Sequence, residues 1–542
     1  MTRPPWWSCL GLFAAMLLCV WLRCHTFAPT LRDRHGIDLW PTAGAASEPL
    51  DCDEAAYGYI GRRISRGAAM YRDLTENKPP GGYWIYAAAE RLGGADELTI
   101  RLVAIPFVLA TIAVLWALGD RLGGPVAAVS TALGYAVAST DPSLFGNGSD
   151  FEHFVNFFSI SSLWLVIRGR GWSAVAAGAC LGASSLVKQV AVTHAFIYII
   201  AFLVDKSRRS DLARFALGFA AAWAAAIASL ALQGSLGAAF EDAIRYGGAL
   251  ATDAPTAPRA PRFLVRLLVG NSDPRDGSLP WPFGTTDYVR WWGAGTWPLW
   301  AGSMVGLALM MSGRGTPGRR LAAWWTISAW VQVAAPRLFW QHYYLLPLPG
   351  AALAVGVALA AGWKARGRYR APGIFLALMM SSSLMGTGAF LVRDYLRVPS
   401  SRLTVYNGGP QWSAQRELGR TIGRRSRVWR SPRLFVWGWQ SSLYFYSGLD
   451  GVTPQVFVDP LLKAFASGNH PQVRPRVERT LRDLEARPPE LIFCGDEPFP
   501  ALSTFLMTHG YRNSSLSRRP GRGDMRGLWV VPSRFEEFEA AR

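Results

Sequence analysis

The sequence has few charged residues for its length. Only 17% of its 542 residues are Asp, Glu, Lys or Arg, whereas half are hydrophobic. A water-soluble protein carries about a quarter charged residues. Cysteine is also scarce, and the six cysteines at positions 9, 19, 24, 52, 180 and 494 lack the CxxC or Cys–His spacing of zinc sites. This composition favours a membrane protein without a zinc motif.

Charged residues are absent from the middle of the long apolar runs. About 20 residues cross the hydrocarbon core of a membrane as a helix. Charges inside a membrane usually mark a transport path, so their absence argues against a pump or a pore. We predict an α-helical polytopic bundle of about eleven transmembrane helices. The runs are 6–24, 101–119, 125–140, 152–168, 172–188, 190–205, 212–233, 293–312, 320–335, 342–362 and 372–392.

The net charge of +19 is gathered in short clusters between the apolar runs. Examples are Lys206-Ser-Arg208-Arg209 and the run from Lys364 to Arg370. Basic clusters are typical of cytoplasmic loops, whereas the sequence contains no motif that reads nucleic acid. We therefore predict an integral protein of the bacterial inner membrane with a cytoplasmic N-terminus and no nucleic-acid partner. Residues 25–100 and everything after 393 then lie outside.

The last part of the chain has a different pattern. Arg433-Leu-Phe-Val-Trp-Gly and Glu490-Leu-Ile-Phe-Cys-Gly resemble strands that end at a glycine, and Val473–Arg487 between them is charged and helical in character. Alternating strands and helices indicate an α/β fold. We therefore predict two domains: a transmembrane domain of residues 1–393 and a small soluble α/β domain of residues 394–542 outside the membrane.

Ionisable residues gather at the predicted outer ends of the helices. Asp150 and Glu152 precede one run, Lys188 follows another, and Arg337 and His342 flank the loop between two more. A ring of such groups at one membrane face suits a reaction on a lipid head group.

The first outer loop carries the densest set of motifs. It contains Asp51-Cys-Asp53-Glu54-Ala-Ala-Tyr57, then Tyr71-Arg-Asp73, then Lys78-Pro-Pro, and it leads to Arg101-Leu at the start of the second run. Glycine and aromatic residues around these motifs indicate a helix that lies along the membrane interface.

In this order, the motifs resemble glycosyltransferase family 39 and its relatives. These are enzymes of the GT-C fold and include protein mannosyltransferases and lipid A aminoarabinose transferases. The resemblance spans roughly residues 5–395 and extends to Glu152, to Val187-Lys188-Gln189, and to His342-Tyr-Tyr-Leu-Leu-Pro347. It implies a GT-C transmembrane bundle, a polyprenyl-phosphate sugar as donor, and membrane lipids as neighbours.

The resemblance also implies functional residues. One outer acidic position falls on Asp53 with Glu54, and the other falls on Asp150 or Glu152. Lys78 corresponds to a lysine that meets the donor phosphate. We further expect donor or substrate contacts from the residues that stand at the other matching motifs, which are Tyr57, Arg101, Lys188 and His342.

The chemistry of such a transfer requires the same two kinds of group, a cation and a carboxylate. A phosphate leaving group is already a weak base, so it needs a cation rather than a strong acid. A carboxylate would accept the proton of the incoming hydroxyl or amine. A single displacement would invert the anomeric centre. The acceptor could be a lipid, a protein or a polysaccharide, and no cofactor is required, although a divalent metal remains open.

Alternative interpretations exist for these residues. Asp51-x-x-Glu54 also fits a helix capping box, and acids near a helix start are favoured by its dipole. Lys188 could extend to the water interface, and His342 could be an interfacial aromatic residue. Asp51 and Asp53 could bind a cation, and two outer cysteines, Cys24 and Cys52, could pair.

Two other functions compete with glycosyl transfer. A transporter or lipid flippase predicts charged or broken helices at mid-membrane and internal repeats, and the sequence shows neither. A non-catalytic protein that binds a cell-envelope polymer would not need two acids and a lysine near one outer face. A phosphoethanolamine-type transferase would need a cluster of metal ligands and a nucleophile, which the sequence lacks.

Overall fold

The computed structural model describes residues 4–40, 44–169, 171–254, 296–312, 315–390, 395–406, 411–517 and 525–541. The chain forms two compact units. Unit 1 comprises Met1–Glu48, Arg101–Ala226 and Pro258–Asn407, and unit 2 comprises Pro49–Ile100, Ile227–Ala257 and Gly408–Arg542. The predicted domain boundary between residues 393 and 394 lies outside the described residues.

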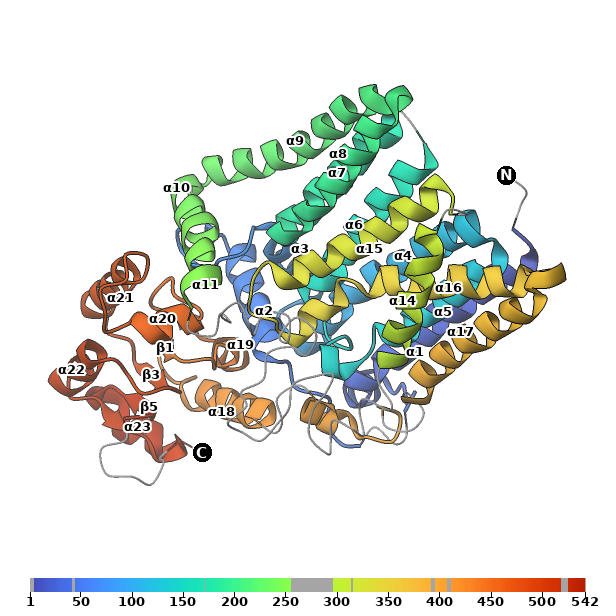
Figure 1. The fold of residues 1–542 in the computed structure, drawn as a ribbon. Helices are drawn as coiled ribbons and strands as arrows, with labels where there is room; N and C mark the ends of the chain where they lie inside the picture. Colours follow the sequence, from blue (N-terminus) through green and yellow to red (C-terminus); the bar gives the residue numbers. More distant parts are fainter. Residues whose placement is uncertain are drawn as a thin grey trace. The chain divides into compact units, whose positions relative to one another are not determined.

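Unit 1 is built from helices (Figure 1). Each of the eleven predicted apolar runs overlaps a helix, so the helical positions were well predicted. Two of these helices, α4 (Glu97–Gly123) and α9 (Arg209–Leu232), cross the boundary between the units. The others are α1 (Trp6–His35), α5 (Pro125–Ala138), α6 (Phe151–Arg168), α7 (Trp172–Val187), α8 (Thr193–Val204), α14 (Trp297–Met311), α15 (Pro317–Ala334), α16 (Leu348–Lys364) and α17 (Arg370–Phe390).

Several of these helices are suited to a membrane. Among the described residues, five segments are long and apolar enough to cross one: Trp6–His35, Glu97–Gly123, Lys206–Leu232, Gln341–Lys364 and Gly367–Ala389. Shorter apolar helices are found at Pro125–Ala138, Trp172–Val187, Gln189–Val204 and Trp297–Met311. The total of about eleven crossings stays a prediction, because it depends on the shorter helices.

Small residues let the helices of unit 1 approach closely. A Cβ atom added at Gly178 of α7 would lie 1.9 Å from the backbone oxygen of Phe215 in α9, and one added at Gly218 of α9 would lie 1.9 Å from that of Val175 in α7. Glycine is therefore required at both positions, as is common where membrane helices pack through small residues.

Unit 2 combines helices with one sheet. Its helical segments are α2 (Cys52–Ser65), α3 (Gly81–Gly93), α10 (Leu236–Ala239), the π-helix η5 (Phe240–Tyr246), α11 (Gly247–Asp253), α18 (Gln411–Arg425), α19 (Ser442–Ser447), α20 (Pro460–Phe465), α21 (Arg474–Ala486), α22 (Pro500–Thr508) and α23 (Phe535–Ala540). Helix α2 packs on α3 and on α19, so the segment Pro49–Ile100 is joined to the C-terminal part of the chain within this unit.

The sheet has five strands in the order β2-β1-β3-β5-β4. Both predicted strands are present, and helix α21 lies between them in sequence as expected. Strand β1 is parallel to β2 and β3, whereas β5 is antiparallel to β3 and β4. The strands are β1 (Arg433–Trp437), β2 (Asp450–Gly451), β3 (Leu491–Cys494), β4 (Arg512–Asn513) and β5 (Gly527–Val530).

All six cysteines are free thiols in the structure. The pairing considered for Cys24 and Cys52 is therefore not present.

Candidate functional site

The predicted site residues are divided between the two units. Unit 1 contains Arg101, Asp150, Glu152, Lys188 and His342, whereas unit 2 contains Asp53, Glu54, Tyr57 and Lys78. The structure therefore describes two clusters. The unit 1 cluster is Glu152, Lys188, His342 and Tyr343, and the unit 2 cluster is Asp53, Tyr57, Glu76 and Lys78.

The unit 1 cluster joins residues from one end of α6, one end of α7 and a 3-10 helix. Glu152 lies in the first turn of α6, Lys188 follows α7, and His342 lies in the short 3-10 helix η7 (Gln341–Leu345). The Lys188 Nζ atom forms an ion pair with Glu152 Oε1, and His342 Nε2 lies 3.9 Å from the same oxygen. The three residues that sequence reasoning placed at one membrane face are thus brought together.

Burial changes the interpretation of Lys188. Its side chain is 7% exposed and that of Glu152 is 1% exposed. The Lys188 Nζ atom also lies 4.1 Å from the centre of the Tyr343 ring, a cation–π contact that is strong when desolvated. The alternative in which Lys188 extends to the water interface is therefore wrong.

The loops around His342 have unusual backbone conformations. Arg337, Phe339 and Phe145 adopt φ angles of 57°, 52° and 58°. Non-glycine residues rarely occupy this left-handed region, and those that do are concentrated at functional sites. The ring of Phe145 packs edge-on against that of His342, with centroids 5.8 Å apart, so the strained loop contacts the unit 1 cluster directly.

Arg101 contacts an acid that sequence reasoning missed. Its Nη1 atom lies 3.6 Å from Glu48 Oε2, and Asn147 Nδ2 donates to the same oxygen at 2.6 Å. Glu48 has no exposed side-chain surface. Glu48 lies in a short irregular segment before the Asp51 motif and belongs to no periodic pattern, so only its buried contacts identify it.

Asp150 is the N-cap residue of α6, but its side chain makes no capping hydrogen bond there. It is 1% exposed. The nearby chain is held by Arg23, a second residue missed from sequence, which donates to the backbone oxygens of Gly148 at 3.1 Å and Ser139 at 2.9 Å. A buried guanidinium thus fixes the loop that leads into α6.

In unit 2, helix α2 begins with a capping box. Asp51 Oδ1 accepts hydrogen bonds from the backbone N–H groups of Asp53 at 2.8 Å and Glu54 at 2.9 Å, and Glu54 Oε2 accepts one from the backbone N–H of Asp51 at 3.3 Å. The capping interpretation is therefore confirmed for Asp51 and Glu54. A catalytic role for Glu54 stays a prediction.

Asp53 stands outside that capping pair. It is half-buried, and its Oδ2 atom accepts a hydrogen bond of 3.1 Å from Tyr57 Oη, one helical turn further along α2. Lys78 lies against the same tyrosine, with its Nζ atom 5.4 Å from the ring centre. Tyr57 thus connects the predicted acid to the predicted phosphate-binding cation.

The Tyr71-Arg-Asp73 motif positions Lys78. Tyr71 has a φ of 68° and is buried, and its hydroxyl donates to the backbone oxygen of Lys78 at 2.8 Å. The Lys78 ammonium lies 3.4 Å from Glu76 Oε1, and its side chain remains 17% exposed. This lysine is held in place from both ends while part of it faces solvent.

A further acid, Asp242 of the π-helix η5, accepts a hydrogen bond from the backbone of Glu76. Burial raises the pKa of Asp242 to about 6, while the guanidinium of Arg476 acts in the opposite direction. Arg476 forms an ion pair with Asp242. No motif marks Asp242, because its partners come from distant parts of the sequence.

A metal site has limited support. Within the described ranges, no three His, Cys, Asp or Glu side chains are grouped as ligands for an ion. The Asp51 carboxylate already accepts two backbone hydrogen bonds. We therefore derive no step through a metal.

Apolar helices of membrane-crossing length, with acids and cations at their ends, define an integral membrane protein. A family model described as dolichyl-phosphate-mannose-protein mannosyltransferase matches residues 77–232. That segment includes Lys78, Arg101, Asp150, Glu152 and Lys188. A search of curated proteins finds no match.

Solved structures with the same fold include two membrane glycosyltransferases. ArnT from Cupriavidus metallidurans bound to undecaprenyl phosphate has a TM-score of 0.61 and 16% identity, and the match covers 97% of each chain. The apo oligosaccharyltransferase of Archaeoglobus fulgidus has a TM-score of 0.50 and 13% identity over 90% of this chain and 69% of that chain. The predicted resemblance to GT-C glycosyltransferases is confirmed by the family match and the shared fold.

Proposed function

We propose that this chain transfers a glycosyl group from a polyprenyl-phosphate sugar to an acceptor at the outer face of the membrane. The observation that carries the proposal is that Asp53 accepts a hydrogen bond from the Tyr57 hydroxyl while Lys78 lies against the ring of the same tyrosine. This arrangement supplies a base and a cation, the two groups that the transfer needs. The family match over residues 77–232 supports a mannosyltransferase-like activity.

The reaction is a direct displacement at the anomeric carbon. The acceptor hydroxyl or amine forms a bond to that carbon as the bond from the carbon to the phosphate oxygen breaks. The acceptor proton moves to the Asp53 carboxylate, and the electron pair of the broken bond leaves on the polyprenyl phosphate. Lys78 stabilises this phosphate as its charge increases. One displacement inverts the anomeric configuration.

The donor is assigned from chemistry and from similarity. Lys78 is partly exposed and held near an aromatic ring, which suits a phosphate next to a sugar. The ArnT structure with this fold was obtained with undecaprenyl phosphate bound, and the archaeal oligosaccharyltransferase has been described in complex with an inhibitory peptide and a dolichol-phosphate. A polyprenyl-phosphate donor is consistent with both.

Glu152, Lys188, Arg101 and His342 have a supporting role in this scheme. An anionic donor would compete with Glu152 for Lys188, because the two side chains already form a buried ion pair. We therefore place the proton transfer at Asp53 and assign the unit 1 cluster to holding the loops of unit 1 in place.

An assay with purified protein in lipid tests the function. Polyprenyl-phosphate sugars that differ in the sugar would each be offered with membrane lipids, envelope polysaccharide or protein as acceptor. We expect one donor to release polyprenyl phosphate in step with acceptor labelling, and Asp53→Asn to abolish most of both. Equal label transfer by wild type and Asp53→Asn would overturn the proposed mechanism.

The orientation is tested separately. Reporter tags that are active only in the cytoplasm should be active after Arg209 or Arg368 and inactive after Arg420. A cytoplasmic signal from the last fusion would contradict an outer active site, because the C-terminal segment would then lie inside.

A further inference from the structure

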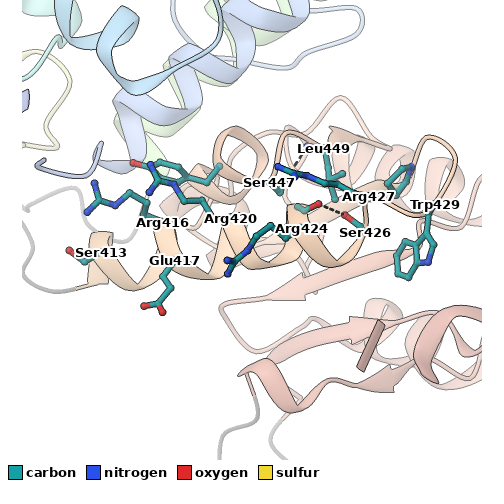
Figure 2. A pocket seen from close by; sticks show the side chains of 13 residues that line it. Ser413, Arg416, Glu417, Arg420, Arg424, Ser426, Arg427, Trp429, Ser447 and Leu449 are labelled. Atoms are coloured by element: carbon teal, nitrogen blue, oxygen red, sulfur yellow. Dashed lines mark hydrogen bonds between the residues drawn. The ribbon is translucent and has the colours of Figure 1, made fainter. Parts of the chain in front are cut away.

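A row of arginines lines a cavity in unit 2, outside the clusters described above. The cavity has a volume of about 760 Å³. Arg416, Arg420 and Arg424 are spaced four residues apart on α18, so they share one face of this helix, and Arg427 follows in the next turn (Figure 2). The remaining lining residues are Ser413, Glu417, Gly423, Ser426, Trp429, Pro432, Tyr446, Ser447 and Leu449.

Two of these arginines have no acidic partner among the described residues. Arg416 and Arg420 form ion pairs with Glu97 at 3.5 and 3.1 Å. No carboxylate pairs with Arg424 or Arg427 within the described part of the chain, where Arg424 donates only to the Thr421 hydroxyl at 3.0 Å. The lining therefore has an excess of positive charge, because Glu417 is its one acidic residue among four arginines.

Aromatic residues form another part of the wall. Tyr446 lies beneath the Arg420 guanidinium, 6.0 Å from ring centre to Cζ. Trp429 also lines the cavity and is 6% exposed. The cavity thus combines cations with aromatic side chains.

We propose that this cavity binds a phosphorylated sugar. The planar guanidinium fork matches the oxygens of a phosphate, and the charge of Arg424 and Arg427 suits a dianion better than a single carboxylate. The volume falls within the range of small-molecule sites and leaves room for a sugar ring against the aromatic wall. The site is independent of the proposed transfer reaction, because none of its residues belongs to either cluster.

Binding to the full-length protein in detergent tests this site by calorimetry. The probes are glucose 6-phosphate, octyl glucoside 6-phosphate, glucuronate and unphosphorylated glucose. Arg424→Gln with Arg427→Gln removes both unpaired cations, and Arg430→Gln is the matched control, because Arg430 is exposed and does not line the cavity. Thermal unfolding of each variant checks that the fold is retained, and Arg424→Gln alone serves if the double variant unfolds.

We expect glucose 6-phosphate to bind saturably to wild type and to Arg430→Gln. The double variant should bind it at least about a hundredfold more weakly, since each charge-assisted hydrogen bond accounts for about tenfold or more. Tighter binding of the octyl compound would identify a lipid head group as the source of the ligand, and equal binding would identify a soluble sugar phosphate. The proposal is overturned if glucuronate or glucose binds as tightly, if both variants lose affinity equally, or if no probe binds.

Discussion

The two clusters hold an acid and a lysine in different ways. In unit 1 the Glu152 carboxylate is bound directly by Lys188, and both side chains are almost fully buried. In unit 2 the half-buried Asp53 accepts from the neutral hydroxyl of Tyr57, while Lys78 lies against the ring of that tyrosine. A buried ion pair is costly to separate, and the half-buried Asp53 is more accessible to an acceptor than the almost fully buried Glu152. The comparison assigns structure mainly to the first cluster and proton transfer to the second.

The largest expected effect is on turnover, from a change at Asp53. Asp53→Asn keeps the size of the side chain and its bond to Tyr57 but removes the basic group. Since a general base contributes about 10²–10⁴-fold, the transfer rate should fall by that factor at saturating donor. Single-turnover rates with labelled donor provide the measurement.

The matched control for that change is Tyr57→Phe, which removes the hydrogen bond and keeps the Asp53 carboxylate. It should lower the rate less than Asp53→Asn does, because the carboxylate that accepts the proton is still present. A Tyr57→Phe enzyme that is slower than Asp53→Asn would mean that the tyrosine, not the aspartate, carries the chemistry.

The second effect should be a lower free energy of unfolding when Lys188 is replaced. Lys188→Met leaves the Glu152 carboxylate buried without its cation, and loss of one member of such a pair destabilises by about 3–5 kcal/mol. The double variant Glu152→Gln with Lys188→Met removes both charges and should recover most of the loss. Thermal or chemical unfolding in detergent measures this cycle. If the Lys188→Met protein were as stable as wild type, the conclusion that the unit 1 cluster mainly stabilises the fold would be wrong.

The third effect concerns donor affinity. Lys78→Ala should weaken donor binding by about ten- to a hundredfold, the value of a hydrogen bond to a charged group. Lys78→Arg should retain part of the affinity because the charge remains. Donor titrations measured by fluorescence or calorimetry would compare the two variants. Equal affinity in all three proteins would identify Lys78 as a surface lysine that Glu76 and Tyr57 happen to contact.

The sequence predicted much of the helical arrangement because its signals are local. Apolar runs, basic loops and the Asp51-x-x-Glu54 spacing are each readable within a few residues, and the helix positions and the capping box agree with them. The two strands around Arg433 and Leu491 were also readable, because each is a short apolar run that ends in glycine.

The residues that the sequence did not reveal can be recognised only from contacts between distant parts of the chain. Glu48 is recognisable only through Arg101 and Asn147, and Arg23 only through the backbone oxygens of Ser139 and Gly148. Neither contact leaves a pattern of spacing in the sequence. The same reason explains why the direct pairing of Lys188 with Glu152 could not be distinguished from exposure at a helix end.

The smallest expected effect separates the acids of helix α2 from one another. Asp51 Oδ1 accepts the backbone N–H groups of Asp53 and Glu54, so its role is to begin the helix. Asp51→Ala should therefore reduce the free energy of unfolding by about 1 kcal/mol.

Asp51→Asn should be almost silent, because asparagine caps a helix nearly as well as aspartate. Turnover per folded molecule should change little in either variant, in contrast to Asp53→Asn, whose stability should stay near wild type. Measuring both quantities for the three variants tests whether two acids only two residues apart have different roles. If Asp51→Asn instead slows transfer a hundredfold at unchanged stability, the negative charge of Asp51 takes part in the reaction and the assignment of proton transfer to Asp53 alone is wrong.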